Sequence, residues 1–184
     1  MRSYITSYNA MFSRVVPEAP VVERIEIPLI QRDYAQGRGG DAVKRIRKNF
    51  LEVLHGAVTG GDRVSLDFVF GDVEDGTLHP LDGQQRLTTL FLLHWYLAFR
   101  ADRLNPGQGW ENFSYATRAS ARLFCDRLTM CRPPIDVENL SQWIQDQSWY
   151  LHTWRHDPTI ESMLVMLDAM HDRFWGADCL AAWD

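Results

Sequence analysis

The sequence has few cysteines and no arrangement of them that suggests a disulfide or a zinc site. Its 184 residues include Cys125, Cys131 and Cys179, with no Cys-x-x-Cys pair. An odd number of cysteines without paired spacing argues against a disulfide framework. We therefore expect reduced thiols and a cytoplasmic protein.

The sequence also lacks a long hydrophobic run. Its most apolar stretch, residues 87–99, spans 13 residues and includes Thr88, Thr89 and His94. A membrane-spanning helix needs about 20 apolar residues, and the polar, aromatic start of the chain has no signal-peptide core. These two absences predict a soluble protein without a membrane partner.

Basic residues are in the minority, since 19 Lys and Arg stand against 24 Asp and Glu, for a net charge of −5. This balance excludes a generally basic nucleic-acid binder. The charge is nevertheless uneven, at +4 for residues 1–50, −4 for 51–100 and −5 for 101–184. Only Lys44 and Lys48 are lysines. The planar guanidinium groups of the many arginines permit phosphate or carboxylate sites, although genomic composition bias produces the same ratio.

Hydrophobic periodicity predicts an α+β chain whose second half is helical. Strands are expected at 21–27, 64–70 and 77–81, with a turn at 71–76. Helices are expected from an Asp41 N-cap to Gly60, from 84 to about 100, and at about 118–130, 137–148 and 158–174, the last capped by Asp157. A linker at 105–109 divides the chain into an α/β domain, 1–104, and a helical lobe, 105–184. We expect the lobe to continue in a longer protein.

The strongest local motif is Asp82-Gly83-Gln84-Gln85-Arg86, between a predicted strand and a buried helix. A sharp glycine turn leaves the first N–H groups of that helix without intrahelical partners, and the helix dipole adds positive potential. Phosphate is the natural ligand there, and Arg86 could clamp it. Asp82 could coordinate Mg²⁺ or orient Arg86, while Gln84 and Gln85 could hold phosphate oxygens or an attacking water. The alternative is that Asp82 merely caps the helix and the glutamines are exposed.

A second polar cluster follows the first predicted strand. Residues 27–34 read Ile-Pro-Leu-Ile-Gln-Arg-Asp-Tyr and place Gln31, Arg32 and Tyr34 in a loop pinned by Pro28. Functional groups concentrate in loops on rigid scaffolds. Taken alone, however, the segment reads better as a surface connection with an incidental arginine.

Together, the two motifs resemble a known family. The segments Ile-Pro-x-x-Gln-Arg-x-Tyr (27–34) and Asp-Gly-Gln-Gln-Arg-Leu-Thr-Thr-Leu (82–90) resemble the N-terminal, GmrS-like domain of the GmrSD family of type IV restriction proteins. Segments 113–118 and 143–149 are weaker parts of the same resemblance, which covers about residues 20–175. The resemblance implies a ParB/sulfiredoxin-like fold followed by the helical lobe.

The resemblance also implies an activity: binding and hydrolysis of a nucleoside triphosphate with Mg²⁺, in bacterial defence against phage that carry modified DNA. Catalysis would involve Asp82, Gln84, Gln85 and Arg86, with Asp82 as the metal ligand. The nucleotide contacts would be Gln31, Arg32, Tyr34, Gly83 and Thr88, and Arg118 would reach the nucleotide from the helical lobe.

The resemblance further implies partners. Family members usually continue into a C-terminal HNH-type nuclease domain, but no His-Asn-His cluster follows the helical lobe here. DNA cleavage is therefore not assigned to these residues, and DNA contact would belong to the full-length protein. The alternative is a non-catalytic module, gated by nucleotide or sensing DNA. A third hypothesis is direct DNA binding by the basic residues 38–48, although such residues on one helix usually form a solvated face. A homo-oligomer is compatible with all three.

Two further candidates have simpler explanations. His152 and His156 have a spacing that could share a metal on a helix, but no cysteine or carboxylate completes the set. Trp143, Trp149 and Trp154 could stack on bases, but their roughly helical spacing favours a packed interface. We expect exposed histidines and buried tryptophans.

Overall fold

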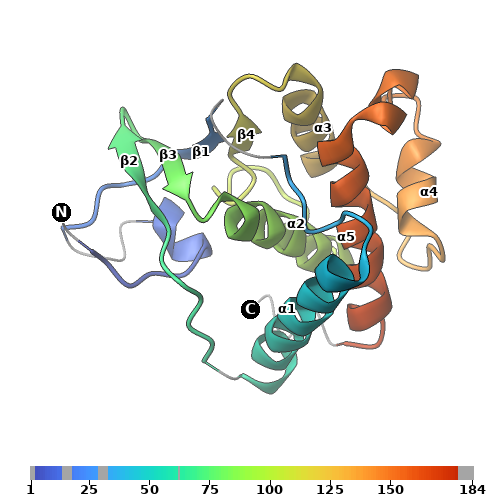
Figure 1. Ribbon diagram of the computed structural model, residues 1–184, viewed down its shortest axis with the longest axis horizontal. Helices are drawn as coiled ribbons and strands as arrows, with labels where there is room; N and C mark the ends of the chain where they lie inside the picture. Colours follow the sequence, from blue (N-terminus) through green and yellow to red (C-terminus); the bar gives the residue numbers. More distant parts are fainter. Residues whose placement is uncertain (1–2, 14–17, 29–32, 62, 178–184) are drawn as a thin grey trace.

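The computed structural model describes residues 3–13, 18–28, 33–61 and 63–177. In chain order, its elements are η1 (Asn9–Phe12), β1 (Arg24–Ile27), α1 (Asp41–Gly60), β2 (Phe70–Glu74), β3 (Thr77–Asp82), α2 (Gln84–Arg100), β4 (Phe113–Tyr115), α3 (Ala119–Thr129), α4 (Leu140–Gln145), η2 (His152–His156) and α5 (Pro158–Phe174). The sheet lies on one side of α2, and α5 and α4 lie on the other (Figure 1).

The four strands form one mixed sheet in the order β2-β3-β1-β4. Strand β1 runs parallel to β3 and to β4, whereas β2 is antiparallel to β3. Strand β1 is shorter than the predicted 21–27, and Ile25 and Ile27 point into the core. Because β1, β3 and β4 are parallel, their carboxyl ends meet at one edge of the sheet. The predicted α+β class is confirmed.

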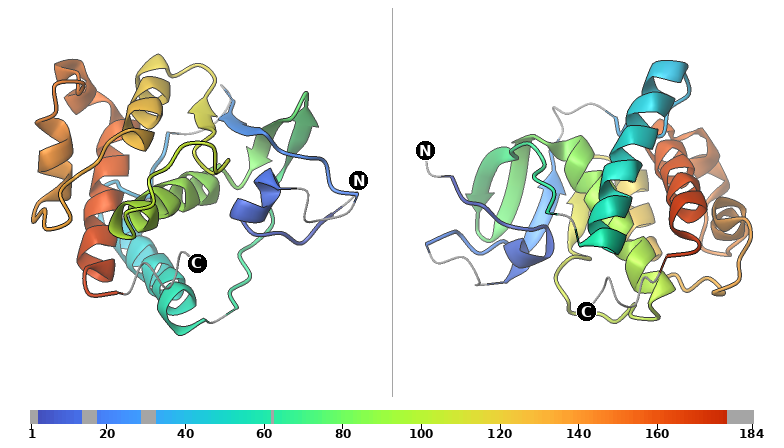
Figure 2. Two further views of the ribbon diagram at one scale, coloured as in Figure 1. Left: turned by 180° about the vertical axis from the view of Figure 1, so that it is seen from behind. Right: turned by 90° about the horizontal axis from the view of Figure 1, so that it is seen from below.

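Helix α2 forms the centre of the fold, as its apolar residues on nearly every side predict. Phe91 stacks on Phe113 of β4 with ring centroids 4.7 Å apart. On the side of α5, the hydroxyl of Tyr96 lies 3.2 Å from Nδ1 of His171. Helix α2 is therefore enclosed between the sheet and α5 (Figure 2). Among the described residues, no helix combines the length and apolar character needed to cross a membrane.

The strand predicted at 64–70 is wrong. Strand β2 begins at Phe70, where the prediction ended, and residues 63–69 form no strand. The alternating apolar side chains of this segment do not face the core, since Phe68 is 74% exposed. Alternation alone does not show that a segment finds a pairing partner.

The position of the hairpin turn explains this difference. The predicted turn at 71–76 is reduced to Asp75-Gly76, whose φ angles are 47° and 75°. Two residues at positive φ close a tight type I′ hairpin. Glu74 must then pair with Thr77, so the strand has to precede the turn directly. The returning strand, predicted at 77–81, is confirmed by β3.

The segment after the linker is not all helical as predicted. Residues Phe113–Tyr115 form β4, which extends the sheet by pairing with β1. Phe113 and Tyr115 are buried and Ser114 between them is half-buried, in the alternation of a strand. Three residues carry too little periodicity to reveal a strand in the sequence.

The helices predicted for this segment are present. Helices α3 and α5 match the ranges predicted for them, whereas α4 is shorter than the predicted 137–148. Asp157 caps α5 as predicted, because its Oδ1 accepts from the N–H groups of Thr159 at 2.9 Å and Ile160 at 3.2 Å.

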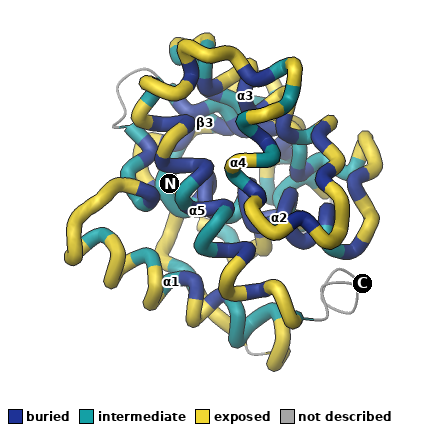
Figure 3. Tube along the Cα trace, turned by 90° about the vertical axis from the view of Figure 1, so that its right-hand side faces the viewer, coloured by how far each residue is buried: buried dark blue, intermediate teal, exposed yellow. Residues whose placement is uncertain are grey.

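Helix α1 lies at the periphery, and Figure 3 shows much of it exposed. It spans the predicted range, but Gly40 rather than Asp41 occupies the N-cap position. Its buried residues, Leu51 and Leu54, both lie in its second half. Its first half is exposed or half-buried, including the basic residues of 44–48, as expected of a solvated face.

Candidate functional site

The Asp82-Gly83 turn joins β3 to α2 without an intervening loop. Gly83 has a φ of 89°, in the left-handed region that favours glycine. Its N–H donates to the Asp82 carboxylate over 2.8 Å. A Cβ atom on Gly83 would lie 2.9 Å from Cγ2 of Val69. Glycine is needed here because the chain turns sharply while packed against a neighbouring segment.

The start of α2 is left uncapped by this turn. Gly83 is the N-cap residue, and no side chain in the described part of the chain caps the helix. Asp82 is exposed and binds the N–H of Gly83, so the alternative in which it caps the helix is wrong. The first N–H groups of a helix lack intrahelical acceptors and carry the positive end of the dipole. The geometry suits an anion.

The two glutamines of the motif are engaged within the protein, not exposed. Gln84 is buried and donates from Nε2 to the carbonyl oxygen of Pro80 at 2.9 Å. Gln85 holds the backbone of the segment that follows β1. Its Nε2 donates to the Asp33 carbonyl at 3.0 Å, and its Oε1 accepts from the Ala35 N–H at 2.8 Å.

Arg86 is held by the extended segment before β2. Its Nη2 donates to the carbonyl oxygen of Phe68 at 2.7 Å, and its Nη1 lies 3.4 Å from Oδ2 of Asp67. The Asp67 side chain is 87% exposed, so this ion pair is screened by water. The Nε of Arg86 is buried and has no hydrogen-bond partner among the described residues. One donor of the guanidinium therefore remains unsatisfied. Asp67, and not Asp82, orients this arginine.

Tyr34 and Thr88 lie inside the core. Tyr34 is 1% exposed, and its hydroxyl is 2.8 Å from Oγ1 of Thr89. Burial raises the pKa of Tyr34 above its ordinary value, against a smaller opposite effect of the hydrogen bond to Thr89. Thr88 is also buried, with its Oγ1 3.1 Å from the hydroxyl of Tyr115. Both residues thus belong to the core at α2, and their predicted contact with a nucleotide stays a prediction.

The predicted residues Gln31 and Arg32 lie outside the described residues. The described chain on either side of them approaches the motif, however. Strand β1 ends at Ile27, at the edge of the sheet where β3 also ends. On the other side, the carbonyl of Asp33 is bound by Gln85. The structure therefore brings the ends of the two predicted segments together.

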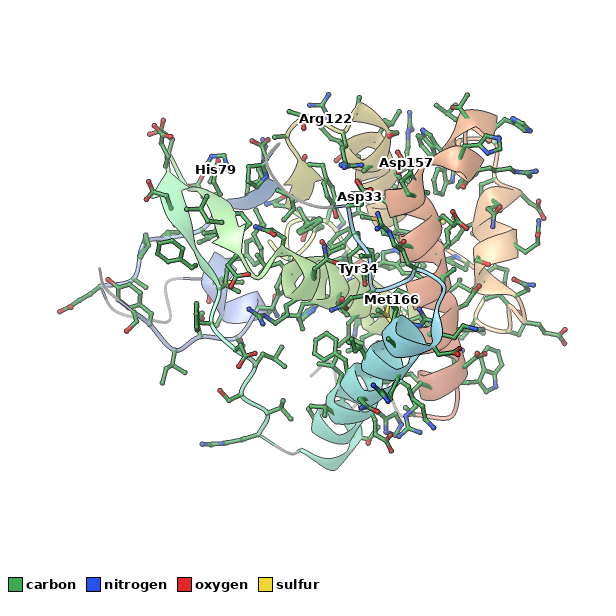
Figure 4. The ribbon with its side chains drawn as sticks, viewed as in Figure 1. Asp33, Tyr34, His79, Arg122, Asp157 and Met166 are labelled. Carbon is green, nitrogen blue, oxygen red and sulfur yellow. The ribbon has the colours of Figure 1, made fainter. Side chains whose placement is uncertain are left out.

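The side chain of Asp33, which is not among the predicted site residues, joins two arginines. Its Oδ2 lies 2.7 Å from Nη2 of Arg38, and its Oδ1 contacts Nη2 of Arg118. Arg118 also lies 3.4 Å from Oγ1 of Thr159 on α5. Figure 4 shows Asp33 and Tyr34 on the segment that leads to α1. The available signal was a carboxylate inside the polar cluster of 31–34.

The weaker candidates have structural roles or none that is visible. The rings of His152 and His156 are 6.4 Å apart in η2, and no group of three or more potential metal-ligating side chains occurs among the described residues. Trp154 is buried and Trp149 partly buried, in an aromatic cluster with Phe124. The expected packed interface is confirmed for these tryptophans.

A hollow of about 460 Å³ lies apart from the motif, between the starts of α3 and α5 and the helix η2. Its lining includes the apolar residues Leu123, Leu151 and Trp154 and the polar residues Ser120 and Asp157. No residue of 82–86 lines it. It is therefore not the predicted nucleotide site.

Comparison with protein families finds a match over most of the chain. Residues 18–173 match the family described as GmrSD restriction endonuclease, N-terminal domain. The chain belongs to this family. Comparison with curated proteins and with solved structures finds no match. The resemblance predicted from residues 27–34 and 82–90 is thereby confirmed.

Both motifs of this GmrSD N-terminal domain lie within the matched range, on the two segments that Gln85 holds together. Membership gives the chain a role in a GmrSD restriction protein.

Proposed function

We propose that this GmrSD N-terminal domain binds and hydrolyses a nucleoside triphosphate in the cytoplasm, in support of restriction of phage DNA that carries modifications. The observation that carries the proposal is the uncapped start of α2 directly after the Asp82-Gly83 turn. It presents main-chain donors and the positive end of a helix dipole where β3 ends. A phosphate chain is the ligand that such a terminus and a nearby arginine recognise.

Arg86 is the side chain that would clamp the phosphates. A cation in the first turn of a helix opposes the dipole, and the exposed carboxylate of Asp67 compensates it only weakly. A bound phosphate would offset this repulsion and offer an acceptor to the unsatisfied Nε. Gln31 and Arg32 are proposed as further contacts, because the described chain on both sides of them lies beside the motif.

Asp82 suits the Mg²⁺ that accompanies a triphosphate. One of its carboxylate oxygens accepts from Gly83, and the side chain is exposed. Magnesium in nucleotide sites is usually held by one or two carboxylates, waters and the phosphates themselves. A single carboxylate beside an anion site fits that pattern. When bound, the ion would neutralise charge on the phosphates, and Asp82 would hold it.

Gln84 and Gln85 would act by positioning, because their amide groups already have partners in the protein. Gln84 fixes the end of β3 against the start of α2. Gln85 fixes the residues that follow Gln31 and Arg32. Gly83 permits the close approach of the backbone, while Tyr34 and Thr88 support the site from the core.

Release of phosphate by the whole chain tests this proposal. We expect Asp82→Ala and Arg86→Ala each to lower the rate at least about 100-fold, because each removes charge stabilisation of the reacting phosphates. Arg45→Ala, an exposed arginine at the start of α1, is the matched control and should retain the wild-type rate. Equal rates in the wild type, Asp82→Ala and Arg86→Ala would refute the assignment.

A non-catalytic, nucleotide-gated or DNA-sensing module is the second candidate. The engaged amides of Gln84 and Gln85 favour it, since neither side chain is free to orient an attacking water in this conformation. Calorimetry that shows nucleotide binding without phosphate release would support this alternative. In both cases we propose that DNA is contacted by the full-length protein, through its expected HNH-type nuclease domain or a homo-oligomer.

A further inference from the structure

The carboxylate of Asp33 binds a guanidinium group with each of its oxygens, Arg38 through Oδ2 and Arg118 through Oδ1. A third arginine, Arg47, donates from Nη1 to the carbonyl of Gln36 at 2.8 Å. Three cations thus gather around residues 33–38 with one carboxylate between two of them. The cluster has an excess of positive charge in a protein whose net charge is −5.

The two ion pairs of Asp33 are partly open to solvent. The exposed fractions are 25% for the Asp33 side chain, 47% for Arg38 and 35% for Arg118. Ion pairs at such exposure contribute little to stability, because water solvates the separated charges well. Asp33 can therefore be replaced as a partner by another anion without loss of the fold.

The cluster is bonded to the Asp82–Arg86 motif and to α5. The main-chain carbonyl of Asp33 accepts from Gln85 at 3.0 Å. Nη1 of Arg118 lies 3.4 Å from Oγ1 of Thr159, which is on α5. The same segment packs tightly on α5, since a Cβ atom on Gly37 would lie 1.9 Å from the carbonyl oxygen of Ser162. Asp33 is thus held at the first turn of α2, Arg118 contacts both Asp33 and α5, and Arg38 joins them through its ion pair with Asp33.

We infer that Arg38 and Arg118 form a second phosphate subsite, and that Asp33 occupies it as an internal anion when no ligand is bound. The inference rests on the proposed function, and it assigns the subsite to the terminal phosphates of a triphosphate. A phosphate group has enough oxygens to bridge two guanidinium groups as the carboxylate does, and it carries more charge. Binding would exchange the carboxylate for phosphate and release Asp33 to solvent.

This exchange predicts that replacing Asp33 and replacing either Arg38 or Arg118 change triphosphate affinity in opposite directions. Asp33→Asn removes the competing charge but keeps the shape of the side chain and the main-chain bond to Gln85, so a triphosphate should bind about fivefold more tightly. Arg38→Gln and Arg118→Gln each remove a charged hydrogen-bond donor, and each should weaken binding about tenfold. A purely structural role of Asp33 would instead make Asp33→Asn bind more weakly.

Calorimetric titration of the whole chain with inorganic tripolyphosphate, and with a non-hydrolysable ATP or GTP analogue plus Mg²⁺, tests the inference. Arg122→Gln and Asp126→Asn are the matched controls, since both residues are exposed on α3 and change the net charge by the same amounts. Thermal melting confirms that every variant is folded. We expect the Asp33 variant to tighten binding of both probes and the two arginine variants to weaken it, beyond the controls.

The outcomes separate the two proposals. If wild type binds tripolyphosphate with this pattern but binds neither nucleotide analogue, the subsite stands and the nucleotide function fails. If wild type binds a nucleotide analogue while all three variants match their controls, the subsite is overturned and the nucleotide function stands. Weaker binding by Asp33→Asn overturns the proposal that Asp33 competes with phosphate as an internal anion. The pattern appearing with a short DNA duplex, but not with tripolyphosphate, overturns the assignment to a triphosphate.

Discussion

Helices α1 and α2 begin in similar ways and differ in everything around them. Each follows a glycine at positive φ, Gly40 at 105° and Gly83 at 89°, and in neither does a side chain among the described residues cap the helix. A Cβ on Gly40 would meet nothing within 4 Å, whereas one on Gly83 would approach Val69. The first turn of α1 is solvated, and that of α2 is bonded to three other segments.

The difference shows that the residues around an uncapped helix start decide whether it is a good anion site. Both helices carry cations near the N-terminus, where a cation opposes the dipole. At α1, water screens Lys44 and Arg45. At α2, Arg86 is largely withdrawn from water and keeps an unsatisfied donor. The anion site is therefore proposed at α2 and not at α1.

Alanine at the two glycines would test this contrast most strongly. Gly83→Ala should lower the free energy of unfolding by about 3 kcal/mol, because it combines backbone strain with a clash against Val69. Gly40→Ala should lower it less, by about 1–2 kcal/mol, because backbone strain acts there without a clash. Urea denaturation of both variants measures the difference. Equal losses would mean that the surroundings of Gly83 add nothing.

Loss of the Gln85 side chain would test whether the motif holds the segment after β1. Gln85→Ala removes the bonds to Asp33 and Ala35 and leaves two partly buried backbone groups unpaired. We expect a loss of about 2 kcal/mol in the free energy of unfolding. Gln142→Ala, which removes an exposed bond to Asp146, should cost less than about 0.5 kcal/mol. A neutral Gln85→Ala would refute this positioning role.

The buried surroundings of α2 also predict a pH dependence. Burial lowers the pKa of His94 to about 4, against the smaller opposite effect of its bond to the Leu90 carbonyl. The unfolded chain, with a pKa near 6.5, binds more protons between these values, so stability falls as the pH drops from about 6.5 to 4.

We expect this titration to cost about 1.5 kcal/mol, less than the full shift would give, because the ring is partly exposed. Urea midpoints of the wild type and His94→Leu at pH 7 and pH 4.5 measure it. The wild type should lose more stability than the variant over this interval. Parallel losses would contradict the assignment to His94.

The smallest effect is expected at the start of α1. Lys44→Ala and Lys48→Ala remove exposed cations, so each should change the free energy of unfolding by less than about 0.5 kcal/mol. Neither should change phosphate release. A loss of nucleotide binding in either variant would show that the two helix starts are not as different as their surroundings indicate.

Local pattern was sufficient to predict the parts of the fold that are long or have distinctive chain ends. Helix α2 followed from an apolar surface on every side, and α5 from Asp157 and Pro158 at its start. The hairpin itself is predicted by the turn residues of 71–76, but the alternation of 64–70 places its first strand too early in the chain. Strand β4 was hidden because its three residues are a strand only through their pairing with β1.

The candidate site likewise has parts that could be predicted from the sequence and parts that could not. The Asp82-Gly83 turn and the start of α2 were predictable, since they depend on neighbours in sequence. The partners of the side chains were not, because Phe68 binds Arg86 and Asp33 binds Gln85 from distant parts of the chain. The contact of Arg118 with Asp33 likewise joins distant parts of the chain, whereas that of Arg38 is local.

A crystal structure of the whole chain with a non-hydrolysable triphosphate and Mg²⁺ would show whether the start of α2 binds phosphate. We expect phosphate oxygens within hydrogen-bond distance of the first N–H groups of α2, with the guanidinium of Arg86 turned from Phe68 toward them. Phosphates bound elsewhere, with the start of α2 empty and Arg86 still held by Phe68 and Asp67, would contradict it.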